Sequence, residues 1–383
     1  MHVHLLQQLI RCPSLTPQDA GCLDIIEGYL KPLGFICHRL KFGEGDLQTE
    51  NLYARFGEKS PNFCFAGHTD VVPVGDLKAW SVDPFKGDIK DGFLYGRGAV
   101  DMKGAIAAFI AASYDVIQKD NPSYSISLLL TSDEEGSAIY GTKKVIEWLK
   151  NKGESIDVCL VGEPTNPKTL GEKIKIGRRG SLNATISIQG KQGHVAYPQF
   201  SMNPIPPLLD YLGQLIKEPL DYGTDSFIAS HLEITTVDVG NKVTNIIPCM
   251  AKAQFNIRFN PLHTGQSLKQ YLQNLKDQIA RKFLTALQWS LDIDISGEAF
   301  INHHKGLHDL MCEAIKSVTG FIPELDTSGG TSDARFLKDI CSVIEFGLIS
   351  DQAHQVDEHV SIKDLKTLKE IYACVLRNVK CYI

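Results

Sequence analysis

The sequence lacks three features that would place it in well-defined classes. Its 10 cysteines include no Cys-x-x-Cys pair, no run approaches the roughly 20 apolar residues of a transmembrane helix, and no GxxxxGK phosphate loop occurs. Several cysteines lie inside apolar runs, which favours buried reduced thiols over disulfides. The N-terminus also lacks the basic start and the apolar stretch of an export signal. We therefore expect a cytoplasmic protein that does not enter the membrane.

An excess of positive charge is also missing. There are 39 Lys and Arg against 45 Asp and Glu, and the formal net charge is -6. Binding to nucleic acid or to an anionic membrane requires clustered basic residues, so we expect neither partner. An anionic ligand would have to meet a local basic pocket. The content of 43% hydrophobic and 22% charged residues is that of a globular protein, and a length of 383 residues favours two domains.

Short apolar runs with helical segments between them predict an α/β fold with a mostly parallel sheet. Such nearly unbroken runs are typical of strands that are buried on both faces. Between the first two runs, the small apolar residues of Met102–Gln118 predict a helix packed close to the sheet. The runs are Asn62–Ala66, Ser125–Leu130, Asp157–Val161 and Cys341–Leu348.

The middle of the chain has a different pattern. From Ser181 to Ile188 polar and apolar residues alternate, which predicts a strand with one exposed face. With the elements that follow, the order β-α-β-β-α-β predicts a ferredoxin-like α+β sandwich. We place this domain at residues 180–291, as an insertion into a larger domain formed by residues 1–179 and 292–383. The following elements are a helix near Pro206–Ile216, strands at Leu232–Val239 and Ala251–Phe259, a helix at Ser267–Phe283 and a strand at Leu291–Ile295.

Imidazole and carboxylate side chains follow five separate segments of the larger domain. Ligands in open α/β sheets collect at the carboxyl ends of the strands, so we expect these side chains to meet at one rim. Singly, each carboxylate is more often a helix cap or a solvated loop residue. Together, carboxylates without compensating cations would repel one another, so the rim implies bound cations. The residues are His68, Asp70, Asp101, Glu134, Glu135, Glu163 and His354.

The donor types at this rim favour two divalent metal ions. Two imidazoles and three carboxylates without a thiolate suit Zn²⁺, or a similar transition ion such as Co²⁺, better than Ca²⁺ or Mg²⁺. If Asp101 bridges, each ion receives one His, one terminal carboxylate and the shared Asp. Asp70 follows His68 by two positions and is expected to accept the imidazole N–H. Glu134 is the natural general base for the attacking water.

The motifs around these residues resemble those of the co-catalytic zinc amidohydrolases and carboxypeptidases, which hydrolyse N-acyl amino acids and peptides. The resemblance implies that His68 and Glu163 hold one zinc and that Glu135 and His354 hold the other. It also implies that Asp101 bridges, that Glu134 is the base, and that the inserted domain is a lid through which a homodimer forms. The motifs are GHTDVVP (Gly67–Pro73), GRGAVDMKG (Gly96–Gly104), TSDEEG (Thr131–Gly136), GEP (Gly162–Pro164) and a late His.

Further segments resemble the family members that remove succinate from an N-succinyl diamino acid in lysine and cell-wall precursor synthesis. Such a substrate is a small anion with three carboxylates and one ammonium group. The resemblance implies that His194 reaches across the dimer to stabilise the oxyanion, and Arg178, Arg179 and Arg258 could meet the carboxylates. Other positions match substrate contacts, namely Ser181, Tyr197, Asn245, Gly330 and Thr331. The segments are Ile10–Cys22, Gly177–Ser181, Gly193–Pro198, Thr244–Pro248 and Ser328–Phe336.

Several alternatives stay open. Around His354 the sequence reads AHQVDEHV, whereas related proteins have a larger apolar residue before this His and Lys-x-Asn after it, and His359 is a rival ligand. Arg178 and Arg179 could form a solvated strand edge, and His194 could serve an ordinary turn. The substrate could be N-acetylornithine, another N-acyl amino acid or a dipeptide. A non-catalytic binding protein on the same fold would lack a ligand or the base, yet every such position is filled.

Overall fold

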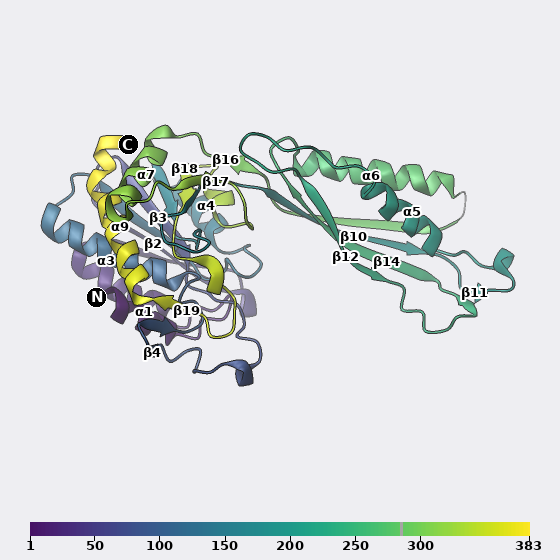
Figure 1. Ribbon diagram of the computed structural model, residues 1–383, viewed down its shortest axis with the longest axis horizontal. Helices are drawn as coiled ribbons and strands as arrows, with labels where there is room; N and C mark the ends of the chain where they lie inside the picture. Colours follow the sequence, from purple (N-terminus) through teal and green to yellow (C-terminus); the bar gives the residue numbers. More distant parts are fainter. Residues whose placement is uncertain (284–285) are drawn as a thin grey trace. The chain divides into compact units, whose positions relative to one another are not determined.

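The computed structural model describes residues 1–283 and 286–383, and the chain divides into two compact units (Figure 1). Unit 1 consists of Met1–Ile176, Asn302–Asp326 and Ser332–Ile383. Unit 2 consists of Gly177–Ile301 and Thr327–Thr331. Both units are therefore discontinuous in sequence, because their segments alternate along the chain.

The core of unit 1 is an eight-stranded sheet formed by β1 (Ile36–Phe42), β2 (Thr49–Phe56), β3 (Asn62–His68), β6 (Ser125–Thr131), β7 (Val158–Val161), β8 (Lys173–Lys175), β17 (Glu324–Asp326) and β18 (Ser342–Glu345). The strand order is β1-β2-β6-β3-β7-β18-β8-β17. The central strands β6, β3, β7 and β18 are parallel neighbours, which confirms the mostly parallel sheet that the apolar runs predicted. Antiparallel pairings join β2 to β1 and β6, and β8 to β18.

Helices cover this sheet so completely that every residue of β3 and β6 is buried. The helices of unit 1 are α1 (His2–Ile10), α2 (Cys22–Leu30), α3 (Lys103–Asp120), α4 (Thr142–Lys152), α7 (Lys305–Thr319), α8 (Ala334–Leu337) and α9 (Ile362–Tyr382). Helix α9 contacts α1, α3 and α7, whereas α4 contacts α8, β2 and β6. A Cβ atom at Gly104 would lie 2.4 Å from the carbonyl oxygen of Ala99, so only glycine fits at the start of α3.

The edges of the sheet were not predicted from the sequence. Strand β1 alternates between exposed and partly buried residues and has no continuous apolar run, and β8 and β17 have three residues each. The predicted strand Cys341–Leu348 is shorter in the structure, because regular pairing of β18 covers only Ser342–Glu345. A further small sheet consists of β4 (Ile89–Lys90), β5 (Phe93–Tyr95) and β19 (His359–Ser361).

Unit 2 is built on an antiparallel sheet with the order β12-β14-β10-β15. Its elements are β9 (Gly177–Arg178), β10 (Gly180–Gln189), β11 (Gly193–His194), α5 (Ile205–Leu215), β12 (His231–Asp238), β13 (Ile246–Ile247), β14 (Met250–Phe259), α6 (Gly265–Lys282), β15 (Gln288–Gly297) and β16 (Phe300–Ile301). The main strands and helices follow the predicted β-α-β-β-α-β order. Because β15 pairs with β10 as far as Gly297, the compact unit extends beyond residue 291.

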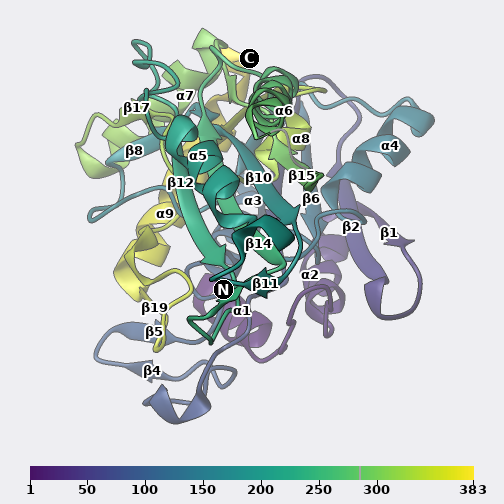
Figure 2. The same cartoon turned by 90° about the vertical axis from the view of Figure 1, so that its right-hand side faces the viewer.

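Two helices cover one face of the unit 2 sheet, and many of the described residues on the opposite face are exposed or partly buried. Leu182 and Ile186 on β10 belong to one apolar core with Leu212 of α5 and Leu272 of α6. The two helices contact each other and lie side by side along the sheet (Figures 1 and 2). From Asn183 to Gln189, the alternating polar residues of β10 point away from this core and are exposed or partly buried, whereas Ser181 is buried. The alternation of polar and apolar residues in the sequence therefore matches the alternation of accessible and buried residues from Leu182 to Gln189.

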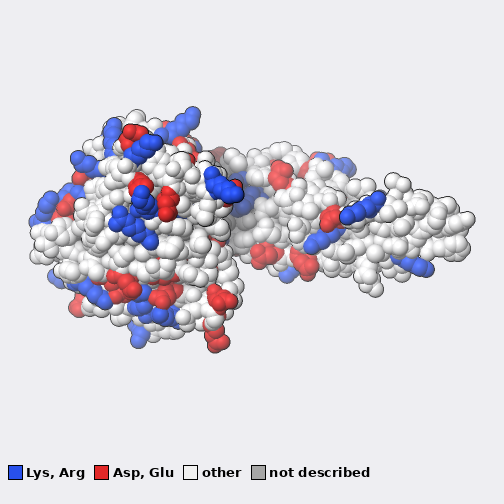
Figure 3. Space-filling view, turned by 90° about the horizontal axis from the view of Figure 1, so that it is seen from below, with Lys and Arg blue, Asp and Glu red and all other residues white. Residues whose placement is uncertain are grey.

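The surface charges of unit 1 are mixed. On the face seen in Figure 3, Lys and Arg side chains are interspersed with Asp and Glu side chains. Among residues 1–283 and 286–383, none of the helices combines the length and the apolar character needed to cross a membrane.

Candidate metal centre

The carboxyl ends of adjacent parallel strands bring the predicted ligands to one rim of unit 1. His68 is the last residue of β3, Glu134 and Glu135 follow β6, and Glu163 follows β7 by two positions. Asp101 lies two positions before the first residue of α3. His354 follows β18 and the 3-10 helix at Ser350–Gln352. The rim therefore forms because β6, β3 and β7 are parallel neighbours that end at the same edge.

Two sets of contacts share the carboxylate of Asp101. In the first set, Nε2 of His68 lies 3.2 Å from Oδ1 of Asp101 and 3.7 Å from Oε1 of Glu163. In the second set, Nε2 of His354 lies 3.3 Å from Oδ2 of Asp101 and 2.8 Å from Oε1 of Glu135. Each oxygen of Asp101 thus faces a different imidazole, which is the arrangement that a bridging ligand requires.

The donor atoms are close enough to surround cations. Ligand atoms of His68, Asp101 and Glu135 lie within 4.8 Å of one another, and so do those of His68, Glu134 and Glu163. Nitrogen and carboxylate oxygen donors at this spacing, without a thiolate, suit a divalent transition ion. The chemistry of the residues present therefore fits a metal centre.

The charge balance of the rim also calls for cations. Burial lowers the pKa of His68, but the hydrogen bond with Asp101 and the charge of Glu163 outweigh it, so the pKa lies well above the usual value. Hydrogen bonds with Asp101 and Glu135 raise the pKa of His354 to about 10. Both shifts favour the protonated imidazole, because carboxylates face each ring. Divalent ions would supply positive charge to these carboxylates in place of the protons.

Glu134 differs from its neighbour in its surroundings. Burial and then the nearby charge of Glu163 raise the pKa of Glu134 well above its usual value. A carboxyl group with a raised pKa holds a proton more readily near neutral pH, as a group that alternately accepts and donates a proton must.

The structure corrects the contact expected of Asp70. Nδ1 of His68 lies 2.9 Å from the main-chain oxygen of Asp70, while the Asp70 carboxylate is 3.7 Å away. That carboxylate instead accepts the main-chain N–H groups of Glu134 at 3.3 Å and Glu135 at 3.1 Å. Asp70 therefore orients the imidazole with its main chain and the two glutamates with its side chain. Alternation of side chains along a strand could not reveal this, because the relevant acceptor is a backbone oxygen.

His354 and His359 have different environments. His359 belongs to β19, where its ring packs against those of Phe93 and Tyr95 at centroid distances of 5.1 and 4.9 Å. His354 has a φ of 63° and contacts Glu135 and Asp101. The short loop after the last buried strand thus brings His354, and not its rival, to the carboxylates.

The residues matched to substrate contacts all lie in unit 2, where they form two groups. In the first group, Nη1 of Arg178 donates to the main-chain oxygen of Gly330 at 3.3 Å, and Nη1 of Arg179 lies 3.2 Å from Nδ1 of His231. Ser181 on β10 pairs with Arg258 on β14. Nη1 of Arg258 is buried and has no hydrogen-bond partner among the described residues. Thr331 belongs to the same short segment of unit 2 as Gly330.

The second group lies at the other end of β10. His194 on β11 pairs with Ile246 on β13, and its ring is 5.6 Å from that of Tyr197. The main-chain oxygen of Asn245 accepts the N–H of Val195 at 3.1 Å. Eight or more strand residues separate this group from Ser181, which corresponds to roughly 25 Å at about 3.3 Å per residue. Figure 1 shows β11 at the opposite end of unit 2 from β16.

A buried glutamate beside the rim was missed by the sequence analysis. Glu358 is fully buried and accepts the main-chain N–H of Asp101 at 3.2 Å. It lies within the segment AHQVDEHV, four residues after His354. A single carboxylate in a loop belongs to no periodic pattern, so the sequence does not show whether it is buried or solvated.

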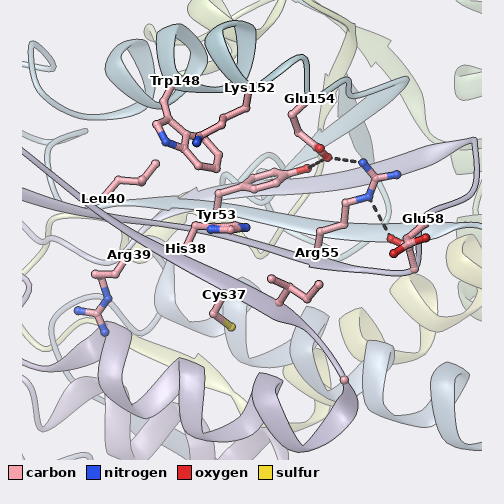
Figure 4. A pocket seen from close by; sticks show the side chains of 13 residues that line it. Cys37, His38, Arg39, Leu40, Tyr53, Arg55, Glu58, Trp148, Lys152 and Glu154 are labelled. Atoms are coloured by element: carbon pink, nitrogen blue, oxygen red, sulfur yellow. Dashed lines mark hydrogen bonds and ion pairs between the residues drawn. The ribbon is translucent and has the colours of Figure 1, made fainter.

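A cavity within unit 1 lies away from the metal rim. It has a volume of about 890 Å³ and is lined by β1, β2 and α4, with Trp148, Tyr53 and His38 around it (Figure 4). The guanidinium of Arg55 is paired there with the carboxylate of Glu154. None of the predicted metal ligands lines this cavity.

Known proteins resemble this chain over nearly its whole length. The sequence model of Peptidase family M20/M25/M40 matches residues 64–378. A relative from Rhodospirillum centenum, named succinyl-diaminopimelate desuccinylase, is 53% identical over 378 residues, which cover 98% of this chain and 96% of the relative. A relative of the same name from Caulobacter vibrioides is 52% identical over 379 residues, which cover 98% of this chain and 95% of the relative.

Solved structures with low sequence identity share the fold. An M20 family metallo-carboxypeptidase from Sulfolobus solfataricus has a TM-score of 0.81 at 18% identity, with 98% of both chains covered. A dinuclear metal-binding peptidase of the M20 family from Bacillus subtilis has a TM-score of 0.73 at 16% identity, with 100% of this chain and 98% of that chain covered.

Proposed function

Because the chain belongs to peptidase family M20/M25/M40, we propose that it hydrolyses the amide bond of N-succinyl-LL-2,6-diaminopimelate. The products are succinate and LL-2,6-diaminopimelate, a precursor of lysine and of the cell wall. The observation that carries this proposal is the identity of 53% over 98% of the chain with a relative named for this reaction. The reaction takes place in the cytoplasm, where this precursor is made.

Two zinc ions fit the rim best, with Co²⁺ as an alternative. His68 and Glu163 would hold one ion, Glu135 and His354 the other, and Asp101 would be shared, in agreement with the two sets of contacts. When bound, such ions supply Lewis acidity toward the amide carbonyl and the attacking water. Asp70 keeps His68 and the main chain of both glutamates in place.

Glu134 is the group that moves the proton. It accepts a proton from the water that attacks the succinyl carbonyl. It then donates this proton to the amine nitrogen as the C–N bond breaks, so the diamino acid leaves as a neutral amine and succinate keeps the new oxygen. The raised pKa of Glu134 supports both halves of this role.

The first group of unit 2 residues would bind the carboxylates of the substrate. The substrate carries three carboxylates and one ammonium group and is therefore a net dianion. Arg258 offers a buried guanidinium nitrogen that has no partner among the described residues, and such a donor costs free energy unless it is paired. Arg178 and Arg179 would add charge, and Ser181, Gly330 and Thr331 would add hydrogen bonds.

The second group of unit 2 residues supports a homodimer. Since His194, Tyr197 and Asn245 lie far along β10 from Ser181, both groups can line one substrate pocket only if two copies of the chain contribute. His194 from the second copy would stabilise the negative charge on the carbonyl oxygen. Unit 2 would thus be both the lid and the dimerisation domain, and unit 1 the catalytic domain.

A release assay on the purified, zinc-loaded protein tests this function. N-succinyl-LL-2,6-diaminopimelate and N-acetylornithine are compared under the same conditions. We expect the succinyl substrate to have the higher kcat/KM. A preference for the acetyl substrate would replace the substrate assignment by that of another deacylase, and activity on neither substrate would refute both.

A further inference from the structure

A buried ion pair connects two segments far apart in the sequence. Nη1 of Arg97 lies 2.9 Å from Oε2 of Glu358, and the residues are 261 positions apart. Arg97 is 2% exposed and Glu358 is fully buried. The proposed function gives neither residue a role. A buried ion pair is often no more stabilising than apolar residues of similar volume, so the other contacts of this pair indicate what it does.

The carboxylate of Glu358 is saturated with hydrogen bonds from the segment that leads to Asp101. Oε2 accepts the main-chain N–H of Gly98 at 3.0 Å in addition to Arg97. Oε1 accepts the N–H groups of Val100 at 2.9 Å and of Asp101 at 3.2 Å. Four donors thus fill the roughly four acceptor positions of a carboxylate. Gly98 has a φ of 83°, which turns its N–H toward Glu358 in a conformation that favours glycine.

Arg97 extends this connection to the two segments that carry the imidazoles of His68 and His354. Its Nη1 also donates to the main-chain oxygen of Gln355, the residue after His354, at 3.0 Å. Its Nη2 lies 3.4 Å from the main-chain oxygen of Pro73, in the segment that follows His68. The guanidinium is held over the ring of Trp80, with Cζ 5.2 Å from the ring centroid.

We propose that Arg97 and Glu358 are positioning residues that hold the segments of His68, Asp101 and His354 in the relative positions that metal binding requires. This rests on the proposed metal role of those three residues. A shared carboxylate must satisfy two ions at once, so a small displacement of the main chain at Asp101 weakens both sites. Glu358 holds that main chain directly, and Arg97 fixes it relative to the segments on either side.

The substitution Glu358→Gln tests this with little change in shape. The amide keeps one acceptor oxygen, but its NH₂ group then faces two N–H donors, either those of Val100 and Asp101 or those of Arg97 and Gly98. We expect Zn²⁺ to bind the metal-free full-length variant roughly 10- to 100-fold more weakly, as measured by calorimetry. The absorption spectrum of the Co²⁺-loaded variant should also change.

The matched control is Glu154→Gln, the same substitution at another arginine-paired glutamate of unit 1. Glu154 pairs with Arg55 at the amino-end side of β7, in the cavity of Figure 4, and not at the metal rim. We expect Zn²⁺ affinity and the Co²⁺ spectrum of this variant to match those of the wild type, even if its unfolding temperature falls.

A second variant, Arg97→Lys, keeps the charge but loses the planar fork that reaches Gln355, Pro73 and Glu358 together. We expect a tenfold or greater loss of Zn²⁺ affinity, and this result decides the matter if Glu358→Gln does not fold. Wild-type affinity and spectrum in either folded variant would overturn the positioning role. These readouts do not depend on the substrate, so a wild-type protein that binds two metals but releases no succinate would refute the proposed function alone.

Discussion

Unit 1 and unit 2 both rest on a β-sheet, but they differ in how many faces of the sheet are buried. In β3 and β6 of unit 1 every residue is buried, so polar chemistry is confined to the strand ends. In β10 of unit 2 buried and accessible residues alternate from Leu182 onward, so polar side chains such as Thr185 and Ser187 lie partly exposed along the strand itself. The first arrangement concentrates ligands at a rim, whereas the second leaves a sheet face on which charged residues can meet a substrate or another subunit.

This difference predicts that substitutions at the rim of unit 1 abolish turnover. For Glu134→Gln we expect kcat to fall by about 10²- to 10⁴-fold, since the amide cannot accept the proton from water. Both metal ions should remain bound, as measured by elemental analysis of the purified variant. Near-normal kcat with two bound metals would remove Glu134 from the mechanism.

The difference in burial can be tested with adjacent residues of one strand. Leu128 and Leu129 of β6 are both fully buried, so each change to Ala should lower the free energy of unfolding by about 2–5 kcal/mol. In β10, Ile186→Ala should cost a similar amount, but Ser187→Ala should change it by no more than about 0.5 kcal/mol. Urea unfolding followed by circular dichroism measures these values. A large cost at Ser187 would show that the open face is covered in solution.

Substitutions on the open face of unit 2 should act mainly on substrate binding. Loss of one hydrogen-bonded charge is worth about 1.5–3 kcal/mol, so Arg258→Ala should raise KM roughly 10- to 100-fold with a smaller effect on kcat. Arg281→Ala, on the exposed last turn of α6, makes the same change away from this face and should leave KM unaltered. Equal KM values for the two variants would contradict a substrate role for Arg258.

Much of the fold could be read from local patterns. Unbroken apolar runs located β3, β6 and β7, and alternation located β10, because burial on both faces or on one leaves a direct mark on the sequence. Edge strands such as β1 were not predicted, because a partly exposed strand shows no unbroken apolar run. The rim residues were found because parallel strands end together, a rule that depends on the topology and not on the individual side chains.

The sequence by itself determined the order of the elements, the donor types at the rim and the side chains available to bind an anion. Tertiary structure decided that His354 and not His359 faces the carboxylates, and that Asp70 holds His68 through its main-chain oxygen. It also decided that the carboxylate of Glu358 accepts a hydrogen bond from the main-chain N–H of Asp101. Periodicity records only which face of an element is buried. Hydrogen bonds between segments hundreds of residues apart depend on how the chain is folded and leave no periodic pattern.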